Sequence, residues 1–195
     1  MNKKLYFLIV LLFLTGYKAR PQGFGSAVNN GVHCNGGVSY DSLASSNIGT
    51  GCYATGFNSF AGGWESVAQG AGSFAFGNMA QATQPGSFAL GGAARANAST
   101  TLSLGFFVTA NQNSSIVIGS GVNSSNPLTA SVAGIMMGMG STCPTLYLST
   151  ATGTHRTGKV AIGDVTPLAK LHIRSDEGED AGIILVPADT ANSRQ

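Results

Sequence analysis

Residues 73–91 read SFAFGNMAQATQPGSFALG, and the motif at the two ends of this stretch recurs after fourteen residues. Similar five-residue blocks begin at 45, 59, 73, 87, 101 and 115, and weaker blocks begin halfway between them, at 52, 66, 80, 94, 108 and 122. A step of seven with two alternating half-repeats is typical of a solenoid. Five residues suit a short strand and two suit a tight corner, so each coil is predicted to hold two strands and two corners.

The stronger half-repeat carries large apolar residues at its second and fourth places, which lie on one face of a strand. In the weaker half-repeat the odd places are small and the even places are polar. We therefore expect a flattened roll whose interior is filled by a ladder of large side chains lying over the alanines of the opposite sheet. The ladder consists of Phe60, Phe74, Phe76, Phe88, Leu90, Leu102, Leu104, Ile116 and Ile118.

Glycines close most of the blocks, where a change of chain direction needs backbone angles that other residues avoid. The predicted turn glycines are Gly49, Gly56, Gly63, Gly70, Gly77, Gly91, Gly105 and Gly119. Between the large residues lie Ser73, Ala75, Ser87 and Ala89, which we expect on the outer surface. Small residues there would allow a sheet of another chain to approach closely, so the pattern predicts side-by-side association of several chains.

Composition favours a structural role over catalysis or nucleic-acid binding. Only 9% of the residues are charged, the net charge is +2, and no cluster of Lys and Arg occurs. His33, His155 and His172 lack neighbouring catalytic partners or metal-ligand spacing, so we predict no catalytic site, cofactor or metal site, and no enzyme. The acidic residues at 176–180 do not follow a calcium-loop spacing, which favours a solvated turn over a calcium site.

The N-terminus has the pattern of an export signal. Lys3 and Lys4 precede an apolar run from Leu5 to Leu14, which is about half the ~20 residues that span a bilayer. Residues 1–19 are therefore predicted to be a signal peptide, and the mature chain is expected to have no membrane span. Residues 20–44 are predicted to be an irregular N-terminal cap, and residues 45–126 to be the roll.

The three cysteines leave two interpretations open. In an exported protein, Cys34 and Cys52 form the plausible disulfide, which would tie the cap to the first coil. Alternatively, Cys52 is a small buried residue at an inward place. Trp64 has two readings as well: packing is favoured over a contact point for a sugar or a partner.

The repeat register breaks after Pro127, so residues 127–195 are predicted to form a β-rich connector or fibre segment. Short strands are expected at 145–149, 159–162, 170–173 and 182–186. Met136, Met137 and Met139 stand among glycines, and adaptable core packing is favoured over a binding groove.

The repeat resembles the head repeats of YadA-like trimeric autotransporter adhesins, on the Ser-Φ-Ala-x-Gly blocks of residues 45–126. The resemblance implies an all-β fold, a left-handed parallel β-roll of 14-residue coils, and a homotrimer. Residues 157–173, from Thr157 to Ile173, resemble the segment VGIG-x-x-x-P-x-AKLHV of Bacteroidetes surface proteins and phage tail fibres. This second resemblance implies a segment that links a β-rich shaft to the next part of the fibre.

Together these resemblances imply a secreted or surface-exposed adhesive fibre protein, outer-membrane associated or extracellular, that binds host or environmental surfaces. Its ligand would be an extracellular matrix protein, a glycan or another surface molecule. The alternatives are a tail-fibre shaft component of a phage or phage-like particle, a secreted polysaccharide-active enzyme, and an ice-binding solenoid. The polar places mix Gln81, Arg95 and Thr109, which argues against the regular threonine column of an ice-binding face.

Overall fold

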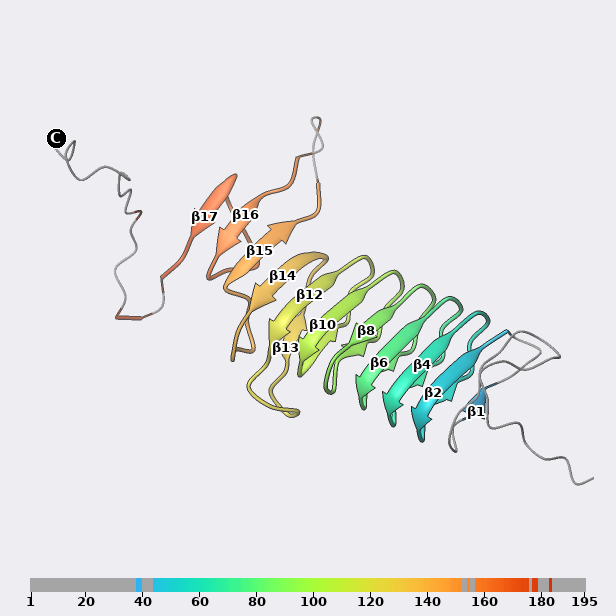
Figure 1. Ribbon diagram of the computed structural model, residues 1–195. Coiled ribbons are helices and arrows are strands. Elements are labelled where there is room, and N and C mark those ends of the chain that lie inside the picture. Colours follow the sequence, from blue (N-terminus) through green and yellow to red (C-terminus); the bar gives the residue numbers. More distant parts are fainter. Residues whose placement is uncertain are drawn as a thin grey trace, which may run out of the picture.

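The computed structural model describes residues 38–39, 44–151, 154, 157–175, 177–178 and 183. Within them the chain is all β, without a helix, and forms a parallel β-solenoid (Figure 1). Short and long strands alternate along the chain and form two sheets, so each coil gives one strand to each sheet. The predicted fold class of stacked 14-residue coils is confirmed.

The seven-stranded sheet contains only short, parallel strands. In spatial order they are β1 (Val38–Ser39), β3 (Tyr53–Ala54), β5 (Val67–Ala68), β7 (Gln81–Ala82), β9 (Arg95–Ala96), β11 (Val108–Ala110) and β13 (Leu128–Ala130).

The ten-stranded sheet contains the long strands and continues past the end of its partner. In spatial order its strands are β2 (Ser46–Thr50), β4 (Phe60–Trp64), β6 (Phe74–Asn78), β8 (Phe88–Leu90), β10 (Leu102–Phe106), β12 (Ile116–Ser120), β14 (Gly134–Gly138), β15 (Leu146–Ser149), β16 (Val160–Ile162) and β17 (Leu171–Ile173).

The register of strand pairing follows the fourteen-residue repeat of the sequence. Phe60 pairs with Phe74, Phe74 with Phe88, and Phe88 with Leu102, each fourteen residues further on. Because the side-chain period of a strand is two, this register stacks identical places of every coil into columns. The columns determine what is inside and what is outside.

The interior between the sheets is lined by small residues, which corrects one sequence prediction. The second residue of each long strand from β2 to β12 is buried, as at Ala61, Ala75 and Ala89, and alanines of the seven-stranded sheet such as Ala82 and Ala96 join the same buried cluster. The predicted small outer face is thus the inner face. It does receive another sheet closely, but that sheet belongs to the same chain.

The predicted ladder of large residues exists, but its placement in the interior is wrong. Phe76, Phe88 and Leu104 are exposed, and the other six members are half-buried on the outer face of the ten-stranded sheet. The spacing of the sheets explains this, because coils joined by two-residue corners leave room for methyl groups but not for phenyl rings. The prediction for the weaker half-repeat is confirmed for the alanines, since Ala80, Ala82, Ala94 and Ala96 are buried. Of its polar places, Asn97 is exposed, whereas Thr109 is buried, which corrects the prediction at that place.

The interior widens toward the C-terminal end of the roll. The inward places of the first coils hold Asn47 and Cys52, the middle coils hold alanines, and the last coils hold Val117, Leu128 and Met136. Met136 is fully buried, which confirms core packing for this methionine, whereas Met139 is exposed. Tyr147 closes this end of the interior, and its hydroxyl donates to the carbonyl of Ala133 at 2.7 Å.

The glycines at the fourth place of the long strands form a column that no other residue could fill. Gly63, Gly77, Gly91, Gly105 and Gly119 have positive φ values between 99° and 136°, or 150° at Gly77. A Cβ atom on Gly77 would lie 2.1 Å from the carbonyl oxygen of Gly91, and the column repeats this contact. The glycine is therefore needed twice, for the backbone angle and for the close approach of the next coil.

The corners use left-handed residues at fixed places. One series precedes the long strands and includes Asn58, Gly72 and Gly86, with φ values of 52°, 63° and 62°. A second series follows them and includes Glu65 and Met79, with φ values of 51° and 57°. The Ser87 hydroxyl donates to the carbonyl of Gln84 at 2.5 Å, and the Ser115 hydroxyl donates to the carbonyl of Gln112 at 2.6 Å. These hydrogen bonds satisfy carbonyls at the corners of the roll.

The parallel pairing continues beyond the predicted end of the roll at residue 126. Val108 pairs with Leu128, so this coil has twenty residues instead of fourteen. The additional residues form a loop in which the Asn123 side-chain oxygen accepts from the amides of Ser125 and Asn126 at 2.9 Å each. The strand β14 then completes the last coil against β12. The repeat pattern is lost in the sequence because of this insertion, while the architecture persists.

The C-terminal strands are attached to the ten-stranded sheet in a new order. β15 is antiparallel to β14, β16 is antiparallel to β15, and β17 is parallel to β16. Three of the four strands predicted after residue 140 are confirmed, and the one at 182–186 lies almost wholly outside the described residues. The predicted signal peptide, His33, Cys34 and His155 also lie outside them, as does most of the predicted cap.

Candidate interaction face

The outer face of the ten-stranded sheet carries two long columns of apolar side chains. The first column is Phe60, Phe74, Phe88, Leu102, Ile116, Ile135, Leu148, Val160 and Leu171. The second is Ile48, Phe76, Leu90, Leu104, Ile118, Met137, Leu146, Ile162 and Ile173, with Gly62 between Ile48 and Phe76. We call these eighteen side chains the outer apolar face.

No member of the outer apolar face is buried by the rest of the chain. Each is half-buried or exposed, and Phe76 retains 47% of its accessible surface. An alanine in the interior removes about one methyl group from water, worth ~0.8 kcal/mol, whereas a fully buried Phe or Leu contributes about 1.5–3 kcal/mol. Six of the eighteen side chains are exposed and the other twelve are half-buried, so the face keeps apolar surface in contact with solvent along its whole length. Exposed apolar surface of this extent marks an interaction site.

The aromatic part of the face is ordered by stacking. The rings of Phe60 and Phe74 lie 4.9 Å apart with 15° between their planes, and those of Phe74 and Phe88 lie 6.4 Å apart. Phe76 leans over Gly62, where a Cβ atom would lie 2.6 Å from the ring. The glycine gap in the second column is thus covered by a neighbouring ring. The result is a continuous surface that is already ordered before any partner binds.

The opposite face of the roll begins with Tyr53 and Val67 and is polar in the coils that follow. The outward places of the seven-stranded sheet include Gln81, Arg95, Asn97 and Asn111, and the Asn97 side chain donates to that of Asn111 at 3.1 Å. The two asparagines thus satisfy each other between neighbouring coils. The roll consequently has two different faces: the outer apolar face of the ten-stranded sheet and the more polar outer face of the seven-stranded sheet.

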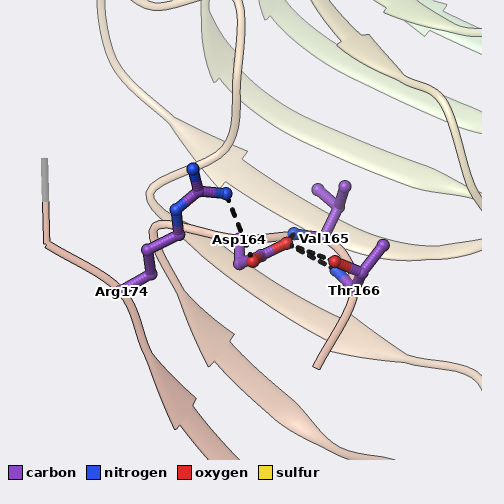
Figure 2. A network of polar contacts seen from close by, with 4 residues as sticks. All are labelled: Asp164, Val165, Thr166 and Arg174. Carbon is purple, nitrogen blue, oxygen red and sulfur yellow. Dashed lines mark hydrogen bonds and ion pairs between the residues drawn. The ribbon is translucent and has the colours of Figure 1, made fainter. Parts of the chain in front are cut away.

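The segment that links β16 to β17 is fixed by polar contacts around Asp164 (Figure 2). The Asp164 carboxylate accepts from the Thr166 hydroxyl at 2.7 Å, from the Thr166 amide at 2.8 Å and from the Val165 amide at 2.6 Å, and Arg174 lies 3.6 Å away. The hydrogen bonds from Thr166, with smaller contributions from Val165 and Arg174, lower the pKa of Asp164 to about 2.

The pH dependence of this contact is predictable. The pKa of Asp164 is below the ~3.9 of an unfolded aspartate, so its contribution to stability is complete above about pH 4 and is lost as the pH falls toward 2. We expect Asp164→Ala to lower the melting temperature at pH 6. The difference from the wild type should shrink below pH 4 and disappear near pH 2 in thermal unfolding followed by circular dichroism. A difference that persists unchanged at pH 2 would contradict this role.

Two lysines connect the backbone before β16 with the link between β16 and β17. The Lys159 ammonium donates to the carbonyl of Pro167 at 2.8 Å, and the Lys170 ammonium donates to the carbonyls of Gly158 at 3.1 Å and Thr157 at 3.0 Å, and also to the Thr157 hydroxyl. Each lysine satisfies carbonyls on the strand or loop opposite its own. The two lysines of the 157–173 motif thus make structural contacts with its own backbone.

Cys52 occupies a place equivalent to that of a serine. Its thiol is free and buried and approaches the carbonyl of Gly63 at 3.3 Å, just as the Ser66 hydroxyl donates to the carbonyl of Gly77 at 3.0 Å. The predicted partner Cys34 lies outside the described residues, so the disulfide stays a prediction, and the inward place of Cys52 matches the alternative.

Replacing Cys52 by Ser tests the two readings. Because Ser66 shows that a hydroxyl fits this place, we expect Cys52→Ser to keep the free energy of unfolding within about 1 kcal/mol of the wild type. Chemical denaturation without reductant is the measurement, with Cys34→Ser as the matched variant. A loss of about 2–5 kcal/mol in both variants would instead indicate the disulfide.

Catalytic and metal chemistry find little support in the described part of the chain. No group of three or more His, Cys, Asp or Glu there is placed to hold a metal ion. Of the described carboxylates, Glu65 and Glu177 are exposed and Asp164 is half-buried, so these three form no buried acid pair. Of the acidic residues at 176–180, for which a solvated turn was favoured over a calcium site, Glu177 alone lies within the described residues. Trp64 is 54% exposed, so the packing reading favoured from the sequence does not describe its surroundings.

Sequence reasoning found the members of the face but not its side or its extent. Ile135, Met137, Leu146, Leu148, Val160, Ile162, Leu171 and Ile173 were not assigned to the ladder, because the repeat is lost after the insertion at 121–126. A signal was nevertheless present: Leu146-Tyr147-Leu148, Val160-Ala161-Ile162 and Leu171-His172-Ile173 each keep two large apolar residues two places apart.

A roll with small residues inside and an apolar strip outside defines the chain as a parallel β-solenoid. Residues 54–80 and 68–94 match the YadA head domain repeat, in two overlapping copies. The repeats and the solenoid fit the head of a trimeric autotransporter-like adhesin, a structural and adhesive fold. No curated protein and no solved structure matches the chain. No helix able to span a bilayer was found in the residues described.

Proposed function

We propose that this chain is an exported, surface-exposed fibre protein that assembles as a homotrimer through its outer apolar face and works as a multivalent adhesin. The observation that carries the proposal is the continuous apolar strip on a roll whose repeats match the YadA head. Three such strips facing a common axis would remove them all from water, as stacked repeats require of their unpaired faces.

The polar face is then directed outward in all three copies. Each copy presents the Gln, Arg and Asn places of the seven-stranded sheet to the surroundings, and Trp64 is exposed at the end of β4. Weak contacts made three at a time can exceed the single-site affinity by a factor of about 100 or more. An extracellular matrix protein, a glycan or another surface molecule is the proposed ligand, and the cell surface or the outside of the cell is the proposed location.

The mass of the full-length chain in solution, after processing of the predicted signal peptide, tests the assembly. Light scattering after size exclusion is expected to give three times the monomer mass across a range of concentrations. A folded monomer at all concentrations would overturn the trimer. Binding of that trimer to immobilised matrix proteins, a glycan array and whole cells tests adhesion, and failure on all three would overturn the adhesive role while leaving the assembly intact.

A further inference from the structure

The outer apolar face does not end where the matched repeats end. The family match stops at residue 94, and the parallel coils stop at β14, but both columns continue across β15, β16 and β17. Ile135 pairs with Leu148, Leu148 with Val160, and Val160 with Leu171. The C-terminal strands, which the sequence presents as a separate connector, therefore extend the same surface.

The chain reverses direction between β14 and β15, so the two columns continue only if the antiparallel register is the correct one. A slip of one residue between β14 and β15 would place every side chain of β15 on the other face. The observed register instead sets Met137 opposite Leu146 and Ile135 opposite Leu148, so both columns are preserved through two antiparallel pairings. The alternate residues Tyr147 and Ala161 are buried on the inner side.

The inner side of β15 and β16 is already covered by the chain itself, and His172 on the inner side of β17 is half-buried. Tyr147 and Ala161 join the same buried cluster as Met136, and Val132 and Val165 pack against that cluster from the neighbouring loops. The seven-stranded sheet ends at β13 and does not extend under β15–β17. The buried cluster and the two loop valines take its place beneath β15 and β16. Among the described residues the outer side chains of β15–β17 are half-buried or exposed, so contact with another molecule would remove them from water.

The shape of the outer apolar face indicates which kind of molecule would cover it. Two side-chain places along a strand span about 7 Å, and ten strands at about 4.8 Å spacing span about 43 Å. A strip so long and narrow, with no charged member, fits a contact line about an axis better than it fits a broad globular partner. A second and third copy of this chain offer the same strip with the same length, and therefore complement it along its whole course.

We propose that β15–β17 form part of the subunit interface, so that one apolar contact runs from β2 to β17 and the C-terminal strands of all copies meet at the same axis as the roll. The inference rests on the proposed homotrimer. It assigns to the segment at 146–173 the role of extending and aligning the assembly. The copies would consequently be held in register at both ends of the face.

Single charge substitutions in the full-length chain test this assignment. Ile162→Glu and Leu171→Glu place a carboxylate on the face at β16 and β17. Leu168→Glu is the matched control, because Leu168 lies in the same segment, is 86% exposed and belongs to neither column. Circular dichroism of each variant checks the fold. Ile162 is the less exposed of the two face residues. Leu171 is 52% exposed, so the monomer is expected to tolerate a carboxylate better at Leu171 than at Ile162.

The expected result is that Ile162→Glu and Leu171→Glu each raise at least tenfold the concentration at which the trimer dissociates, while Leu168→Glu behaves as the wild type. A wild-type trimer that Leu104→Glu dissociates but that Ile162→Glu and Leu171→Glu leave intact would overturn this inference and leave the proposed function standing. A monomeric wild type would overturn both. Equal weakening by Leu168→Glu would also count against the assignment, because general repulsion would then explain the effect.

Discussion

Gly77→Ala is expected to cost on the order of 4 kcal/mol of folding free energy and to unfold much of the roll at room temperature. The added Cβ atom would lie 2.1 Å from the carbonyl oxygen of Gly91, a backbone atom that cannot move without breaking the pairing of the next coil. The φ angle of 150° adds strain, because it lies in a region that residues with a side chain rarely adopt.

Gly72→Ala is the matched control for this prediction. Gly72 also has a positive φ, of 63°, but nothing lies within 4 Å of the position its Cβ atom would take. Its replacement should cost only about 1 kcal/mol, as expected for a left-handed residue at an open corner. Thermal and chemical unfolding of both variants give the comparison. Equal losses in the two variants would show that close contact within the stacked glycine column does not limit stability.

Leu104→Glu is the second substitution with a large expected effect, and it acts on assembly instead of folding. Leu104 is exposed in the middle of the outer apolar face and takes no part in the phenylalanine stack. The monomer should therefore accept a carboxylate at this place. In a trimer, three carboxylates would be brought together in an apolar contact, where charges without partners are costly. The expected light-scattering mass is that of a monomer.

The control for Leu104→Glu lies on the other face of the roll. Thr83→Glu places the same charge on the seven-stranded sheet, which is polar and faces outward in the proposed trimer. This variant should keep the wild-type mass. Retention of the trimer by Leu104→Glu, with an unchanged circular dichroism spectrum, would show that the outer apolar face is not the subunit contact.

Prediction from the sequence succeeded where the information is periodic. The fourteen-residue spacing is sufficient to predict two strands per coil, the parallel register and the columns, because equal places of successive coils must stack when the coils have equal length. The buried alanines of the weaker half-repeat, such as Ala82 and Ala96, were predicted from the same alternation. The strands at 145–149, 159–162 and 170–173 were found from their local pattern alone.

The sequence by itself determined the solenoid, its period and which residues share a face. Only the tertiary structure decided which face is inside, because alternation is the same for either orientation of a strand. The two sheets of each coil approach so closely that Ala75 and Ala82 fill the space, and Phe74 and Phe76 must lie outside. The tertiary structure also decided that β15–β17 continue the face, since that depends on the register of antiparallel pairing after an insertion, and a non-periodic segment carries no record of its register.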